Sequence, residues 1–232
     1  MSSRGATLAV IPARGGSRGL PGKLLRTLGG VPLIVHTIRA AAAAARLDHV
    51  LVSTDDPAIR RVSLGSGADV PFLRPPELST DEAPTPPVIR HAVEWFEAST
   101  GRPVAVVVTL QPTSPLRGAD EIDAAVALLD ESRVDSAVSI SELGLPISVV
   151  GQVDGGRWRS LAPAGTAPRR QASPPAMRLT GGIYVSRREL LDRDLLVGDR
   201  VAPLVVGPDS AIDIDTADDL SAARAAWRRR RA

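Results

Sequence analysis

A glycine-rich loop flanked by positive charge is the first feature of this chain that points to chemistry. Residues 11–23 read IPARGGSRGLPGK and carry Arg14, Arg18 and Lys23 among four glycines. Glycine lets backbone N–H groups approach an anion closely, and the cationic side chains add charge-assisted hydrogen bonds. A loop that needs glycine only for its backbone would explain the glycines but not the three cations. The composition therefore favours a binding site for a chain of phosphates.

Two well-known phosphate-binding motifs do not match this loop. The Walker A pattern, G-x-x-x-x-G-K-[ST], has Ser17 in place of its first glycine here and Leu24 after the lysine. The dinucleotide fingerprint G-x-G-x-x-G does not fit the spacing of Gly15, Gly16 and Gly19. The loop is thus expected to hold phosphate in some other way.

A pair of carboxylates near the C-terminal end of the chain suggests a metal site. In the stretch AIDID, residues 211–215, Asp213 and Asp215 are two apart, so a strand there would point both to one face. Oxygen ligands of this kind suit Mg²⁺, although an ordinary edge carboxylate is the alternative. Thr216 and Asp219 have the spacing of a capping box, so we assign Asp218 and Asp219 to capping the last helix.

The elements that must position these residues follow a βα pattern. Continuous β-branched runs at 7–12, 49–54 and 104–110 are typical of strands buried on both faces. Helical patterns lie near 32–46, 56–67, 86–99 and 119–131. The alternation predicts an α/β fold with a doubly wound, mostly parallel sheet. Ligands of such sheets bind beyond the carboxyl ends of the strands, where the 13–22 loop follows the first strand.

The pattern loosens after residue 132. The stretches DSAVSISEL, ISVVGQVDG and GRWRSLAP predict short antiparallel strands, and a proline-rich connection follows at 163–175. GGIYVSRREL restores a strand and a short helix, AIDID is expected as the last strand, and a last helix ends the chain. We interpret residues 1–232 as a single domain with an inserted β-rich arm at 140–178 and a basic tail at 226–232. The proline-rich stretch 74–87 is expected as a long loop, and such loops are often functional.

Composition excludes several other classes of protein. Net charge is only +2, aromatic residues make up 3%, and the one dense basic block, WRRRRA, is expected as a solvated tail, so no nucleic-acid partner is predicted. The chain has no cysteine and three scattered histidines, which excludes thiolate chemistry and argues against a zinc cluster. No apolar run approaches the ~18 residues of a membrane span and no signal peptide is evident, so we expect a soluble, cytoplasmic protein without a membrane partner.

The loop IPARGGSRGLPGK resembles the signature loop of the acylneuraminate cytidylyltransferase (CMP-sialic acid synthetase) family. Three further segments occur in the family's order, and together they extend over nearly the whole chain: LQPTSPLR at 110–117, RRQ at 169–171 with RLTGGIY at 178–184, and DIDT at 213–216. The first loop alone is shared with other nucleotidyltransferases, including the enzymes that activate Kdo. The resemblance implies a Rossmann-like nucleotidyltransferase fold and a homodimer formed through the inserted arm.

The reaction implied by this resemblance joins CTP to a 2-keto-3-deoxy sugar acid of the nonulosonic, sialic-acid-like class, giving a CMP-sugar and pyrophosphate with Mg²⁺ as cofactor. The implied catalytic residues are Arg14, Lys23, Asp213 and Asp215, the last two as metal ligands. The implied nucleotide-binding residues are Arg14, Gly15, Gly16, Ser17, Arg18, Lys23, Arg74, Thr80 and Asp81. The implied sugar-binding residues are Gln111, Arg170, Gln171, Arg178 and Thr180. Ser114 and Arg117 are equally compatible with a structural role, and we interpret Tyr184 as a core residue.

The chain departs from the family pattern at two positions. Leu24 stands where the family usually has asparagine after the loop lysine, and Thr180 stands where it usually reads RLNG. The second departure removes an amide and suggests an acid that lacks the 5-N-acyl group or is decorated differently. Two alternatives stay open: an enzyme on the same scaffold that acts on Kdo or a phosphonate, and a non-catalytic homologue that only binds nucleotide.

Overall fold

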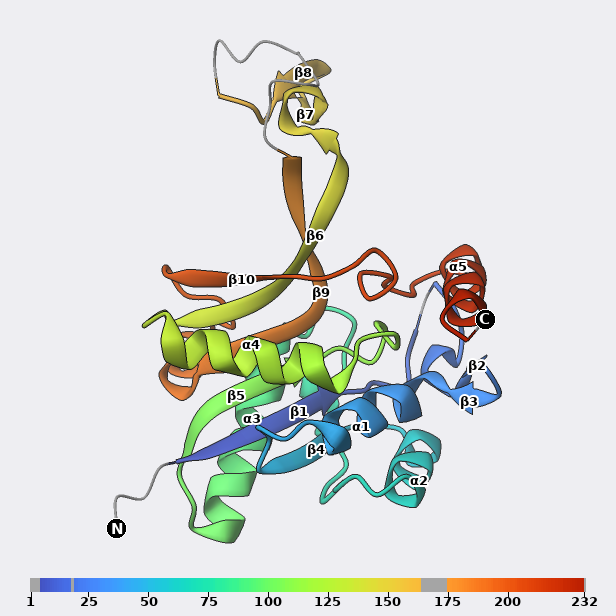
Figure 1. Cartoon of the computed structure of the whole chain (residues 1–232). Helices are drawn as coiled ribbons and strands as arrows, with labels where there is room; N and C mark the ends of the chain where they lie inside the picture. The colour runs from blue at the N-terminus through green and yellow to red at the C-terminus, as the bar shows by residue number, and fades with distance from the viewer. Residues whose placement is uncertain (1–4, 18, 164–174, 232) are drawn as a thin grey trace.

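The central sheet is mixed, with one strand running against the others. The computed structural model describes residues 5–17, 19–163 and 175–231, and over these the strand order is β10-β6-β9-β5-β1-β4 (Figure 1). The strands are β1 (Ala6–Pro12), β4 (His49–Ser53), β5 (Val104–Leu110), β6 (Ser136–Pro146), β9 (Pro175–Arg187) and β10 (Val201–Val205). Among the described strands of this sheet only β9 is antiparallel to its neighbours, β5 and β6. The predicted mostly parallel sheet is confirmed.

Helices cover both faces of this sheet, and β1 shows why. Its side chains alternate between two apolar cores, because successive residues of a strand point to opposite faces. Ala9 and Ile11 belong to the core under α1 (Leu33–Ala43), α2 (Pro57–Gly65) and α4 (Ala119–Glu131). Leu8 and Val10 belong to the core under α3 (Thr85–Thr100) (Figure 1). Apart from Thr7, the strand is therefore apolar, as expected for a doubly wound sheet.

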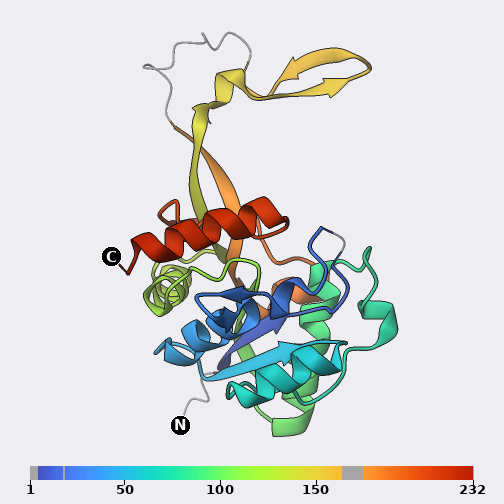
Figure 2. The same cartoon turned by 90° about the vertical axis from the view of Figure 1, so that its right-hand side faces the viewer.

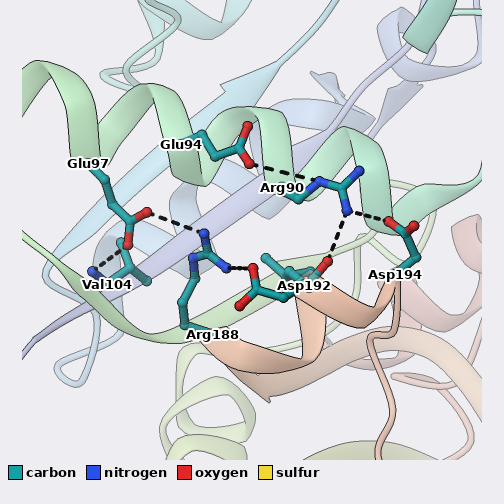
Figure 3. A network of polar contacts seen from close by, with 8 residues as sticks. Arg90, Glu94, Glu97, Val104, Arg188, Asp192 and Asp194 are labelled. Atoms are coloured by element: carbon teal, nitrogen blue, oxygen red, sulfur yellow. Dashed lines mark hydrogen bonds and ion pairs between the residues drawn. The ribbon is translucent and has the colours of Figure 1, made fainter.

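An ion-pair network joins α3 to η4 (Arg188–Arg193), the 3₁₀ helix that follows β9 (Figure 3). Arg90 and Arg188 lie between four carboxylates, those of Glu94, Glu97, Asp192 and Asp194. Glu97 also accepts a hydrogen bond from Val104 N at 3.0 Å, at the start of β5. Partly exposed pairs of this kind each contribute little, but several charges in one network hold two elements more firmly.

The arm is an extension of two sheet strands. Beyond the sheet, β6 and β9 continue as a two-stranded ribbon that projects from the body and leads to η3 (Ile147–Val149) and to the hairpin of β7 (Gly151–Asp154) and β8 (Arg157–Ser160) (Figures 1 and 2). Within the predicted insertion at 140–178, two of the three predicted short antiparallel strands are present as β7 and β8, whereas the stretch DSAVSISEL belongs to the long strand β6. A small hairpin of β2 (Thr27–Leu28) and β3 (Val31–Pro32) completes the fold, with η2 (Pro76–Leu78) inside the proline-rich loop. Among the described helices, none is long and apolar enough to cross a membrane.

The predicted last strand, AIDID, is wrong. Residues 211–215 form a turn and irregular backbone outside the sheet, because their backbone groups bond locally and to Thr113 O rather than to a neighbouring strand. Ile214 is fully buried in a third core, against α5 (Ala217–Arg229). The last strand is instead β10, which carries Pro203 and lies at the sheet edge, where proline is tolerated.

The C-terminal arginines are exposed, and three of them also contact neighbouring side chains. Arg229 bonds Asp209 at 2.7 Å, Arg230 bonds Ser210 Oγ at 2.9 Å, and Arg231 lies over the Trp227 ring. The predicted last helix is present as α5, which ends at Arg229, and the predicted basic tail at 226–232 overlaps its last turn; residue 232 lies outside the described residues. The capping box at the start of α5 is confirmed, since Thr216 Oγ1 accepts from Asp219 N and Asp219 accepts from Thr216 N.

Candidate functional site

The candidate site lies where the order of the strands reverses. From β1 the chain crosses to β4 on one side, then returns to β5 on the other side of β1. The loops after β1 and β5 leave the carboxyl ends of two neighbouring parallel strands, the usual ligand position in such sheets. A cavity of about 310 Å³ opens there. Its lining comprises Pro12, residues 14–17, residues 22–25, Asp56, Ile59, Arg74, Leu78, Thr80, Asp81, Ala83, Thr85, Val88 and residues 111–113.

The glycine-rich loop is shaped by contacts with β4 and by one glycine in a left-handed conformation. Ala13 N continues the β1/β4 ladder to Ser53 O at 2.8 Å, and Gly15 N then donates to Asp55 Oδ1 at 2.9 Å. Gly22 has a φ of 64°, which favours glycine, and it begins the 3₁₀ helix η1 (Lys23–Leu25). This turn brings Lys23 back to the mouth of the cleft.

The structure brings Arg14 and Lys23 to the same cleft, each held by a carboxylate. Arg14 contacts Asp81 Oδ1 at 2.6 Å and Thr80 O at 3.1 Å. Lys23 Nζ lies 2.7 Å from Asp215 Oδ1, and its side chain is 12% exposed. Gly15, Gly16 and Ser17 line the cleft beside them, while the predicted Arg18 lies outside the described residues. A phosphate chain entering this cleft would therefore meet two cations and the N–H groups of a glycine loop.

Asp213 and Asp215 are close neighbours, although not on a strand. The carboxyl of Asp213 has its pKa raised by burial and by the charge of Asp215, while a hydrogen bond from the Thr113 side chain and the charge of Lys23 act to lower it. Its Oδ1 atom is buried and has no hydrogen-bond partner among the described residues. An unpaired carboxylate oxygen beside a second carboxylate fits a bound cation. The cation would pair the buried oxygen and would remove the repulsion between the two carboxylates.

The candidate metal site has only two carboxylates from this chain. Among the described residues, no group of three or more His, Cys, Asp or Glu side chains has the geometry of a metal site. Mg²⁺ commonly takes one or two protein carboxylates and completes its octahedron with water and substrate phosphates. The pair therefore suits a metal ion that arrives with a nucleotide better than one held permanently by the protein.

Two predicted arginines are buried and tie the structure together. Arg74 lines the cleft, but its guanidinium donates to the hydroxyl and carbonyl of Ser53, and burial lowers its pKa to about 10. Arg117 donates to Gly182 O, to Gln111 O and, at 2.8 Å, to Thr37 Oγ1, and burial lowers its pKa to about 9. Of the two roles left open for Arg117, these contacts favour the structural one.

The predicted sugar-binding residues are distributed unevenly. Gln111 lines the cleft, and Arg178, on the arm-side half of β9, donates to Ala211 O at 3.1 Å. Thr180 is not available to a ligand: it is 3% exposed, and its hydroxyl lies 2.6 Å from Ser139 Oγ inside the β6/β9 pair. Its placement in the sugar site is therefore corrected. Arg170 and Gln171 lie outside the described residues.

Several residues of the cleft were missed or undervalued in the sequence. Thr113 lines the cleft and donates a hydrogen bond to Asp213, whereas the sequence analysis selected other residues of the motif LQPTSPLR. Asp55 and Asp56 were not assigned to the site from the sequence, yet Asp55 contacts the glycine loop and Asp56 lines the cleft. Their position directly after a buried strand could have identified them as site residues. Tyr184, interpreted from the sequence as a core residue, is half-buried. Burial raises the pKa of its hydroxyl, and the charge of the nearby Asp213 raises it further.

Comparisons with known proteins agree with this geometry. The family model described as cytidylyltransferase matches residues 8–153. The chain is 34% identical over 226 residues to a CMP-N,N'-diacetyllegionaminic acid synthase of Legionella pneumophila, covering 91% of this chain and 92% of that protein. It is 33% identical over 216 residues to an N-acylneuraminate cytidylyltransferase of Streptococcus agalactiae, and there 91% of this chain spans only 51% of the relative.

A solved structure has the same fold. It is that of a CMP:2-keto-3-deoxy-manno-octonic acid synthetase complexed with CTP, with a TM-score of 0.71, 21% sequence identity, and coverage of 97% of this chain and 99% of the other. At that identity the likeness concerns the fold alone.

Proposed function

Since the chain belongs to the cytidylyltransferase family, we propose that it transfers CMP from CTP to a 2-keto-3-deoxy sugar acid and releases pyrophosphate. One observation carries the proposal: two cations, Arg14 and Lys23, line the cleft at the switch point, and Lys23 also contacts Asp215 of the carboxylate pair Asp213 and Asp215. A sugar acid of the nonulosonic class is the acceptor we favour, because relatives of this chain are named for acids of that class.

The reaction needs positioning and charge neutralisation more than a protein nucleophile. The anomeric hydroxyl of the sugar gives up its proton to water and forms a bond to the α-phosphorus of CTP, the bond from that phosphorus to the oxygen it shares with the β-phosphate breaks, and pyrophosphate leaves. Arg14 and Lys23 would exchange their carboxylate partners for phosphate oxygens, and the amides of Gly16 and Ser17 would add donors. Gln111, at the end of β5, is placed to orient the acceptor.

A magnesium ion is part of the proposal. Asp213 and Asp215 would hold it, and the unpartnered Oδ1 of Asp213 supports this assignment. When bound, the ion supplies charge neutralisation to the triphosphate and to the leaving pyrophosphate. Because Asp215 then faces the ion, Lys23 is released to bind phosphate.

A homodimer formed through the arm is also proposed. In the described part of the arm, six large apolar residues are at least 40% exposed: Leu145, Val149, Val153, Trp158, Leu161 and Met177. A ribbon that projects from the body cannot cover these groups by itself, and an exposed apolar surface of this kind is typical of a contact site. A second copy would cover them. We place the protein in the cytoplasm, where CTP is available.

The test is release of pyrophosphate from CTP in the presence of Mg²⁺, measured across a panel of acids. The panel contains an N-acylneuraminate, an N,N'-diacetyllegionaminate and Kdo, with ATP and UTP as alternative nucleotides. Turnover with CTP and a nonulosonic acid supports the proposal, and preference for Kdo would assign a different acceptor. Binding of CTP without turnover on any acid would favour a non-catalytic homologue, and equal use of ATP would reject the proposed nucleotide.

A further inference from the structure

Asp55 connects β4 to the first turn of the glycine-rich loop. The β1/β4 ladder ends at the pair of Pro12 and Ser53, and Ala13 N adds one more bond, to Ser53 O at 2.8 Å. Past this point the chain leaves β4 for α2, and the side chain of Asp55 takes over as acceptor for Gly15 N, at 2.9 Å. The first residues of the loop are thus held to the sheet by a carboxylate rather than by backbone.

The neighbouring Asp56 restricts which residue can stand at position 15 of the loop. A Cβ atom on Gly15 would lie 2.5 Å from Asp56 Oδ2 and 2.8 Å from Asp56 Cβ, so no side chain fits there. Asp56 cannot easily move, because its Oδ1 caps α2 by accepting from Ala58 N at 2.6 Å and Ile59 N at 3.0 Å. Gly15 is therefore clamped between two consecutive aspartates, one binding its amide and the other packing against its α-carbon.

This clamp decides which groups of the loop face the cleft. The Gly15 amide is engaged by Asp55, whereas Gly16 has open space around its α-carbon and lines the cleft with Ser17. A carboxylate repels phosphate, so Asp55 has no use as a direct ligand of a triphosphate. We propose that Asp55 is a positioning residue that fixes Gly15 and thereby aims Arg14 and the Gly16 and Ser17 amides at the phosphates of the nucleotide. This inference rests on the proposed function.

The chain contains a matched control at the other end of the same two strands. Asp48, directly before β4, accepts a hydrogen bond from Thr7 N of β1 at 2.8 Å. Both aspartates therefore flank β4 and bind a backbone amide on the β1 side, but Asp48 lies at the amino end of the strands, away from the cleft. Removing Asp48 tests the loss of such a bond without disturbing the loop.

The experiment measures dissociation constants by calorimetry for Mg²⁺-CTP and for cytidine, which has no phosphate. Asp55→Ala is expected to weaken binding of CTP about tenfold, the size of one lost hydrogen bond to a charged group, and to leave cytidine within about twofold. Asp55→Asn is expected to stay close to wild type for CTP, because its amide oxygen also accepts from Gly15 N. Asp48→Ala is expected to bind both ligands as wild type does.

Unchanged CTP affinity in Asp55→Ala would overturn the inference, as would an equal loss for cytidine or the same loss in Asp48→Ala. If Asp55→Ala does not fold, Gly15→Ala replaces it, since the added methyl group would meet Asp56 and displace the loop with both carboxylates retained. That variant is expected to show the same phosphate-selective loss, and normal CTP affinity would reject the inference. A wild-type protein that binds no CTP would instead reject the proposed function.

Discussion

Lys23 Nζ lies 2.7 Å from Asp215 Oδ1, although 192 residues separate the two in the chain. The lysine side chain, which lines the cleft, is 12% exposed, whereas the aspartate side chain is 68% exposed to solvent. A triphosphate and a metal ion would each take one partner from this pair. Binding of the nucleotide and of the metal are therefore expected to be linked, because each frees the group that the other needs.

Asp215→Asn is expected to abolish turnover while changing the free energy of unfolding by less than about 1 kcal/mol, because the ion pair is partly exposed. The same change should strengthen binding of CTP without metal, since Lys23 loses its carboxylate partner. Calorimetry in EDTA and a pyrophosphate assay measure the two effects. A variant that binds metal-free CTP more weakly than wild type would contradict the exchange of partners.

Asp213→Asn is expected to stabilise the metal-free protein at neutral pH. Burial and the charge of Asp215 raise the pKa of Asp213 in the folded state, so the wild type loses stability as pH rises from the unfolded pKa through the folded one. Asparagine carries no charge and should remove that loss. Urea unfolding in EDTA at pH 7.5 and at pH 4 tests this: the advantage of the variant should be present at pH 7.5 and smaller at pH 4. A variant less stable than wild type at pH 7.5 would show that the charged carboxylate of Asp213 has more favourable contacts in the metal-free protein than we infer.

Thr180→Asn is expected to destabilise the protein by about 1–3 kcal/mol instead of changing the preferred sugar acid. The hydroxyl is buried against Ser139, and a larger amide would both overfill the site and break the pair. Thr180→Ser keeps the hydroxyl and serves as the control, with a smaller loss expected. Urea unfolding gives the stabilities, and the ratio of kcat/KM for 5-hydroxy and 5-N-acetyl acids gives the specificity. A stable Thr180→Asn protein with altered specificity would restore the first interpretation.

Charge on the arm is expected to dissociate the proposed homodimer. The double change Val153→Glu and Trp158→Glu places two carboxylates on side chains that are 74% and 61% exposed on the hairpin of β7 and β8. Leu64→Glu, on an exposed position of α2 outside the arm, is the control. Light scattering should give a dimer for wild type and control and a monomer for the double variant. A wild type that is monomeric at micromolar concentration would reject the dimer.

Elements with a strong local pattern were predicted accurately. The strand at 104–110 and the helix at 119–131 have the predicted bounds, because an unbroken β-branched run and a helical period are properties of neighbouring residues. The glycine loop was also assigned to the carboxyl end of the first strand, which follows from the βα order. The prediction of a strand at AIDID was wrong although apolar and polar residues do alternate there. The alternation reflects the burial of Ile214 against α5 and not pairing in a sheet.

By itself, the sequence determined the α/β class, the order of its main elements, and the residue types of a phosphate site with a nearby carboxylate pair. Only the tertiary structure decided which of these groups meet. It joined Lys23 to Asp215 and Gly15 to Asp55, and it buried Thr180 between two long strands. The physical reason is that periodicity and turn chemistry act over a few residues, whereas a side chain's partners depend on which strands the fold sets side by side. A motif can name a residue type, but burial and distance decide its role.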